Sequence, residues 1–101
     1  MRETIMGANT DWPFKAPKNT AAITTTQIMH NGHIVLVVVH DENDEWQFLD
    51  GYEVRTENAI VVSLGSIVRR DNSLVSLADL GAGWQAWRDD ACSPWERGKI
   101  S

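Results

Sequence analysis

Six consecutive aliphatic residues, from Ile34 to Val39, constrain the fold of this chain more than any other feature. The run has no polar alternation, which is typical of a strand that is buried on both faces in the middle of a sheet. It is also far too short to cross a bilayer, because a membrane-spanning helix needs about 20 apolar residues. The sequence therefore predicts a protein built around a central β-strand.

Segments rich in β-branched or aromatic residues lie on both sides of this run and predict further strands. They are Ile23 to Met29, Trp46 to Leu49, Ala59 to Ser63 and Trp84 to Arg88. Asn31-Gly32, just before the aliphatic run, is a strong signal for a two-residue hairpin loop. A competing interpretation makes Thr26 to His30 a single helical turn that Gly32 stops.

Two short helices are predicted between the last two of these strands. Ser63 can cap a first helix, in which Leu64, Ile67 and Val68 recur at helical spacing, and Ser73 can cap a second. The fold class is therefore α+β, with a small, mostly antiparallel sheet of four to five strands and two short helices.

The length of 101 residues and a hydrophobic content of 43% are sufficient for one hydrophobic core that needs no disulfide bond or metal ion for stability. We expect a single domain over residues 23–101. Residues 1–22 contain Gly7, Pro13 and Pro17 with little periodicity, which predicts an extended or partly mobile N-terminal segment.

The net charge of −5 is concentrated in one place: residues 41–57 contain seven acidic residues and one basic residue. Such a patch disfavours nucleic acid and anionic membranes, and it favours a basic protein partner, chiefly by accelerating association. The same composition is also typical of a solvated loop that keeps a protein soluble.

The tryptophans divide into core and surface candidates. Trp46 and Trp84 lie on predicted strands with period-two placement, which predicts burial. Trp87 faces away from Trp84, and Trp95 follows a proline, so these two are candidate exposed anchors, and Arg88 would supply a polar contact or an internal ion pair with an acid such as Asp50. The residues predicted to bind a partner are Asp41, Glu42, Asp44, Glu45, Trp87, Arg88, Trp95 and Arg97.

No group of residues makes a convincing reaction centre, and we predict no catalytic residue, metal ligand or cofactor. His30 and His33 would face each other across a two-residue hairpin, but a catalytic zinc normally needs a third protein ligand. His40 lies about 23 Å from His33 along an extended strand, which is too far to complete that site. A small metal-dependent hydrolase at His30 and His33, and a self-associating structural subunit with a tryptophan surface, are the alternative hypotheses.

Cys92 is the single cysteine, so no intrachain disulfide can form, which favours a reducing compartment. The segment Met1 to Gly7 lacks the apolar stretch of a secretory signal. We therefore expect a cytoplasmic protein.

Two stretches together resemble a family of short bacterial domains of unknown function that are classed as immunity-protein-like. They are His40 to Gly51, with its acidic turn and Trp-x-Phe strand, and Leu80 to Asp89, with its Gly-aromatic-Arg segment, followed by Pro94-Trp95. The likeness covers roughly Ile23 to Arg97. It implies a small α+β fold, a cytoplasmic bacterial setting and the binding of a toxin or another protein. A homodimer through the tryptophan surface is a separate hypothesis that does not follow from the resemblance.

Overall fold

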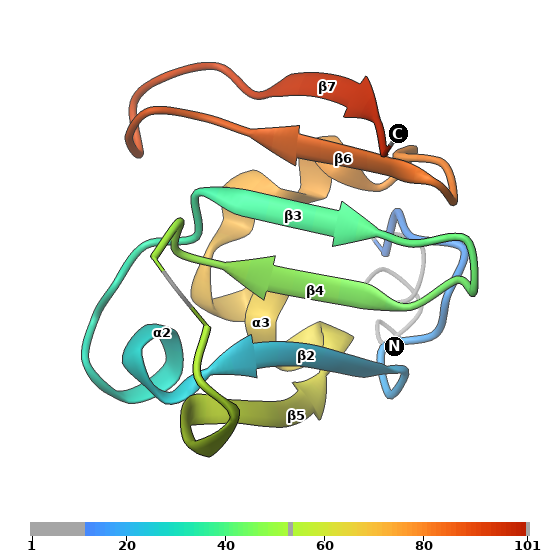
Figure 1. Ribbon diagram of the computed structural model, residues 1–101. Helices are drawn as coiled ribbons and strands as arrows, with labels where there is room; N and C mark the ends of the chain where they lie inside the picture. Colours follow the sequence, from blue (N-terminus) through green and yellow to red (C-terminus); the bar gives the residue numbers. More distant parts are fainter. Residues whose placement is uncertain (1–11, 53, 101) are drawn as a thin grey trace, which may run out of the picture.

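A computed structural model describes residues 12–52 and 54–100 of the chain (Figure 1). The elements in chain order are β2 (Ala21–Thr25), α2 (Thr26–His30), β3 (Val37–His40), β4 (Trp46–Leu49), η1 (Thr56–Asn58), β5 (Ala59–Ser63), α3 (Leu64–Arg70), η2 (Asn72–Leu77), β6 (Trp84–Trp87) and β7 (Glu96–Lys99). Within these described ranges, no helix has the length and apolar character needed to cross a membrane.

The strands form one mixed sheet in the order β5-β2-β4-β3-β6-β7. The α+β class is confirmed, whereas the prediction of four to five mostly antiparallel strands is wrong, because the described residues alone form six strands and β2 runs parallel to β4. The parallel pair arises because β4 returns from β3 and lies between β3 and β2 (Figure 1). Only the second half of the aliphatic run, residues 37–39, belongs to β3, which lies in the middle of the sheet as predicted, whereas residues 34–36 precede the strand.

The segment before Gly32 is the helical turn α2, so the competing interpretation is confirmed and the hairpin prediction is wrong. Thr25 ends β2 and caps α2, since its Oγ1 accepts a hydrogen bond from the Ile28 N–H at 3.3 Å. Ile28 is fully buried, and Gly32 takes a φ of +77°, which favours glycine. Tertiary burial of Ile28 and the cap together outweigh the local hairpin signal.

The strand that sequence analysis missed is β7. It pairs antiparallel with β6, but its residues Glu-Arg-Gly-Lys carry no apolar alternation. Gly98 allows the Trp87 ring to lie close to the backbone, because a Cβ at this position would lie 3.1 Å from the ring, an unusually tight contact. Trp87 therefore packs across the backbone of β7.

One face of the sheet is covered by the helical layer, which lies behind the strands in Figure 1. Val38, Phe48 and Ala86 are side by side on β3, β4 and β6, and all three have 0% exposure. They form the core with buried residues of the helical layer, which include Leu64, Ile67, Leu74 and Leu77. Phe14 also lies in this core and packs edge-on against Trp46, with ring centroids 5.4 Å apart.

Candidate protein-interaction surface

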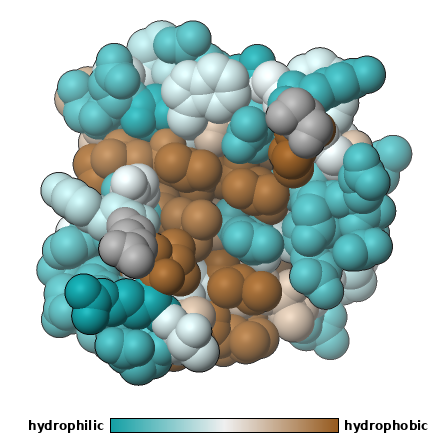
Figure 2. Space-filling view, in the orientation of Figure 1, coloured by the Kyte–Doolittle hydropathy of each residue, from teal (hydrophilic) through white to brown (hydrophobic). Residues whose placement is uncertain are grey.

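The second face of the sheet carries an apolar surface that no described element covers; we call it the open face. Figure 2 shows apolar surface across its middle and hydrophilic surface around it. The strand registers place the following side chains on this face: Ile23, Val37, Val39, Gln47, Leu49, Val61, Gln85 and Trp87. Six of these eight residues are apolar, whereas the same registers place the smaller or polar Ala21, Thr25, Ala59, Ser63 and Glu96 nearer the edges of this face. The centre of the open face therefore resembles half of a core more than an ordinary solvated sheet face.

The centre of the open face comes from the aliphatic run. Val37 and Val39 point to it, whereas Val38 between them is fully buried on the other side. The prediction that this strand is buried on both faces is wrong within the described residues, since Val37 and Val39 are only half-buried. The sequence of β3 is nevertheless that of a strand with two covered faces.

The strands at one side of the sheet separate their charges by face. Glu96 pairs with the exposed Trp87 and therefore shares the open face. Lys99 pairs with Trp84 and lies over its ring on the helical side, with the ammonium 6.0 Å from the ring centroid. Arg97 also faces the helical side, where it reaches η2. The basic side chains of β7 thus leave the open face, and an acidic one remains there.

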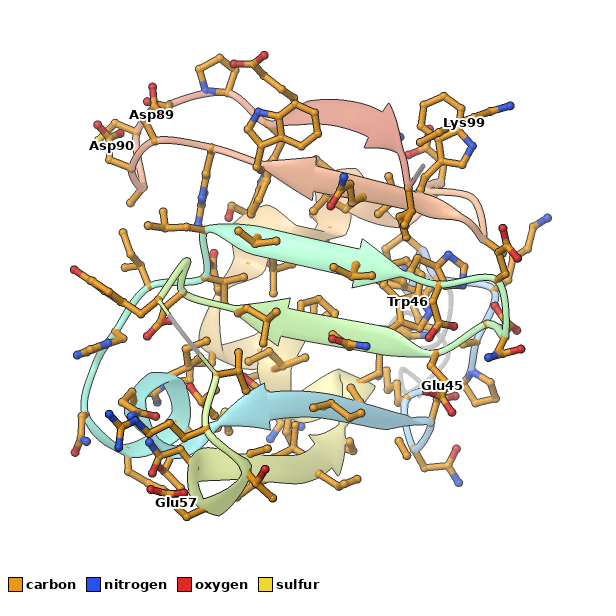
Figure 3. The ribbon with its side chains drawn as sticks, viewed as in Figure 1. Glu45, Trp46, Glu57, Asp89, Asp90 and Lys99 are labelled. Atoms are coloured by element: carbon orange, nitrogen blue, oxygen red, sulfur yellow. The ribbon has the colours of Figure 1, made fainter. Side chains whose placement is uncertain are left out.

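Acidic residues also surround the open face. Figure 3 places Asp89 and Asp90 beyond one end of β6, Glu45 beside the start of β4, and Glu57 next to β5. Glu57 lies 3.9 Å from Arg55, a distance at the outer limit of an exposed ion pair. The surface around the apolar centre is therefore predominantly acidic.

The acidic turn between β3 and β4 uses two of its carboxylates internally. Asp41 accepts hydrogen bonds from the N–H groups of Asn43 and Glu45, at 2.9 and 3.0 Å. Asp44, with a φ of +69°, places its carboxylate against the Nε2 of His40. Glu42 and Glu45 are exposed. The turn therefore offers these two glutamates to a partner, and Asp41 and Asp44 hold its shape.

His40 connects this turn to the helical layer. Its Nδ1 lies 2.7 Å from the carbonyl oxygen of Leu80, and its ring stacks on Trp46 with centroids 3.9 Å apart and planes 12° apart. Because Asp44 contacts the other ring nitrogen, both nitrogens of this buried imidazole face acceptors. His40 is thus a structural link, and its surroundings leave no ring nitrogen for a substrate.

Trp87 and Arg88 are neighbours with opposite roles. Trp87 is 38% exposed on the open face. Arg88 is buried on the other side, where its Nε and Nη2 donate to the carbonyl of Val35 at 3.1 and 2.9 Å and its Nη2 pairs with Asp71 at 2.9 Å. The ring of Trp95 lies over the guanidinium, 4.2 Å from its carbon. Arg88 pairs with Asp71, not Asp50, and together with Trp95 it ties β6 to the helical layer.

Arg97 holds a second contact between the layers. Its Nη2 donates to the carbonyl of Ser76 and to the carboxylate of Asp79, both at 2.8 Å. The hydrogen bond from Arg97 to the Asp79 carboxylate, together with the electrostatic attraction of the guanidinium, lowers the pKa of Asp79 below its usual value of 3.8. Arg97 is therefore engaged on the helical side, away from the open face.

We expect Asp79 to titrate at lower pH in the native protein than in the unfolded chain. Its contribution to stability is then fully present above the unfolded pKa and is lost as the pH falls through the lower native pKa. Substitution of Arg97→Gln removes the charge of the guanidinium and replaces its donors by the weaker, uncharged amide of a shorter side chain, and should return the pKa of Asp79 toward 3.8. Carbon-detected NMR of the carboxyl group measures this shift.

Asp90 provides the internal control for this titration. Its pKa is lowered chiefly by a hydrogen bond from the Ser93 hydroxyl and then by the backbone N–H of Cys92. It should therefore titrate alike in the wild type and in Arg97→Gln. An unchanged Asp79 titration in the variant would contradict the assignment of its shift to Arg97.

The histidines proposed for a metal site do not face each other across a hairpin. His30 ends α2, and His33 instead places its Nδ1 2.8 Å from the carboxylate of Asp50, whose other oxygen accepts from the Tyr52 N–H at 3.1 Å. Across the described ranges, no three histidine, cysteine or carboxylate side chains gather as a set of metal ligands. Cys92 is exposed.

Most of the open face was missed by sequence analysis, which identified only Trp87 among its residues. A signal was present: a strand buried on both faces needs two covering layers, and the two predicted helices supply only one. The unmatched apolar face of the aliphatic run could therefore have indicated an exposed surface.

Comparisons of the chain with models of protein families, with curated proteins and with solved structures find no match. The resemblance to immunity-protein-like domains therefore stays a prediction.

Proposed function

We propose that this domain is a non-catalytic protein-binding module that uses the open face of its sheet to bind a protein with an apolar centre and basic surroundings. The observation that carries the proposal is the partly exposed side of β3, because its Val37 and Val39 belong to a strand whose composition fits two covered faces. A bound partner would cover this side of β3, as the helical layer covers the other side.

The side chains of the open face are suited to protein contact. Trp87 offers a large aromatic surface beside aliphatic residues, and tryptophan is enriched among the residues that contribute most to binding. Gln47 and Gln85 flank Val39 in the strand registers and can donate and accept hydrogen bonds at the centre of the contact. This combination of apolar and hydrogen-bonding side chains favours a specific interface over nonspecific hydrophobic association.

The charge distribution supports a basic partner. Glu42, Glu45, Glu57, Asp89, Asp90 and Glu96 are exposed acidic residues of the turn, the sheet edges and the open face. They would repel phosphate groups of nucleic acids and anionic lipids, and they would accelerate association with a basic protein. A cytoplasmic toxin with a basic surface, the partner that the immunity-like resemblance implies, fits this chemistry.

We expect Trp87→Ala to weaken partner binding by about 30-fold or more, which corresponds to about 2 kcal/mol for a central aromatic anchor. Proteins captured from the native host by the full chain would be purified singly and titrated calorimetrically against the wild type and the variant. Lys99→Ala is the matched control, because Lys99 lies on β7 but faces the helical side. Circular dichroism would establish that both variants are folded.

Two further results bear on the proposal. The association rate should fall as salt is raised, because the acidic surroundings act through screened charges. A captured partner that binds the wild type and Trp87→Ala equally would show that the open face is not its binding surface.

A further inference from the structure

The two edges of the sheet differ in how they are protected. Edge strand β7 carries Glu96, Arg97 and Lys99, and charged residues on an edge prevent pairing with other chains. Edge strand β5 has the sequence Ala-Ile-Val-Val-Ser, with no charge and no proline. Its central residue, Val61, is 69% exposed. No strand of residues 12–52 or 54–100 pairs with the outer side of β5, so within the described chain this edge is open to another strand.

The register of β5 shows which backbone groups point outward. The Leu64 N–H donates to the Thr20 carbonyl at 2.8 Å, in line with the antiparallel register of β5 and β2. Because hydrogen-bonded and non-bonded pairs alternate in such a ladder, Ala59, Val61 and Ser63 direct their N–H and C=O groups away from β2.

Two of these outward-pointing backbone groups have hydrogen-bond partners within the chain itself. The Ala59 N–H donates to the Thr56 carbonyl of η1. Ser63 is the N-cap of α3, so its carbonyl accepts the first hydrogen bond of that helix. The outward groups that remain are the Ala59 carbonyl, both groups of Val61 and the Ser63 N–H.

We propose that a second copy of this chain pairs antiparallel along β5, with the two-fold axis at Val61. Val61 would exchange both hydrogen bonds with Val61 of the second copy, and the Ser63 N–H would donate to the Ala59 carbonyl of that copy. The groups left outward by each β5 are those that its symmetric counterpart requires. Such an interface is isologous, as closed dimers require.

Two residues of opposite charge, Glu57 and Lys18, lie near opposite ends of β5. Glu57 lies 3.9 Å from Arg55, and the Lys18 ammonium lies 5.7 Å from the centroid of the Trp12 ring. Glu57, in η1, lies exposed before the start of β5 (Figure 3). Lys18 lies beyond the other end, where its carbonyl accepts from the Gly65 N–H at 2.8 Å. The antiparallel two-fold arrangement brings Glu57 of each copy to the end that carries Lys18 in the other copy. A parallel arrangement would instead bring like ends together.

The test measures the mass of the full chain by light scattering over a wide range of concentration. A five-residue edge contact belongs to the small, transient class of interface, so the mass should rise from 11.3 kDa toward twice that value with concentration. Val61→Lys should remain monomeric throughout. Gln85→Lys, with the same charge on the open face away from β5, should dimerise like the wild type.

Amide hydrogen exchange of the wild type gives a readout that does not depend on any variant. The N–H groups of Val61 and Ser63 should exchange more slowly as the concentration rises. Charge reversal tests the register: Glu57→Lys and Lys18→Glu should each weaken the dimer, and the double variant should restore it.

Three outcomes would overturn the proposal. They are a wild type that stays monomeric at every concentration, a dimer that survives Val61→Lys, and a dimer that Gln85→Lys dissociates, which would place the contact on the open face. The edge pairing does not depend on the proposed binding function, and each can fail alone.

Discussion

Substitution of Arg88→Ala lowers the free energy of unfolding by an expected 3–5 kcal/mol or so, which is about the cost of removing one partner from a buried ion pair. The side chain of Arg88 is 3% exposed and that of Asp71 is 23% exposed. Removal of the Arg88 side chain also takes both hydrogen-bond donors away from the Val35 carbonyl and exposes the ring of Trp95. Urea unfolding followed by circular dichroism measures the loss.

Two controls separate the network from charge alone. Arg88→Lys keeps the charge but lacks the planar fork that reaches Val35 and Asp71 together, so it should recover only part of the stability. Arg69→Ala removes an exposed arginine of α3 and should change stability by about 0.5 kcal/mol or less. A loss below about 1 kcal/mol for Arg88→Ala would mean that the network is unimportant to stability.

The second large effect compares the two faces of β4. Phe48→Ala should cost about 3–5 kcal/mol, because the ring is fully buried between the sheet and the helical layer. Leu49→Ala, one residue further along the same strand, should cost clearly less, about 1–2 kcal/mol, because Leu49 is only partly buried on the open face. The same urea measurements give both values.

This pair also bears on the proposed function. A partner that covers the open face should bind Leu49→Ala more weakly, although that variant loses clearly less stability than Phe48→Ala. Equal losses of stability for Phe48→Ala and Leu49→Ala would show that the open face is buried within the isolated chain, which contradicts the surface described above.

Local sequence signals predicted α3 and β4, whose stability is local, but the predicted cap of the second helix is wrong, because Asp71 and not Ser73 caps η2. Ser63 caps α3 as expected, with its Oγ accepting from the Ser66 N–H at 3.1 Å. Trp46 and Phe48 share the buried face of β4, as period two requires. In each case the capping group or the alternation is visible within a few residues.

The features that were missed depend on distant partners. Strand β7 forms because it pairs with β6 and supports the Trp87 ring through Gly98, which no pattern within Glu96–Lys99 reveals. The structural position of Arg88 depends on Val35 and Asp71, far away in the sequence. For the same reason, sequence analysis grouped Arg88 and Arg97 with Trp87, although strand alternation separates them onto opposite faces.

The insertion of β4 between β2 and β3 has a consequence for how the sheet assembles. β3 and β4 close over the short turn at residues 41–45, whereas the parallel pairing of β2 with β4 and the pairing of β6 with β3 close much longer loops. Because the entropy of loop closure grows with loop length, we expect the β3–β4 hairpin to be the kinetic nucleus. The sheet would then grow from its centre toward its edges. The hydrogen bonds of Asp41, which shape the turn between β3 and β4, would therefore influence the rate of folding.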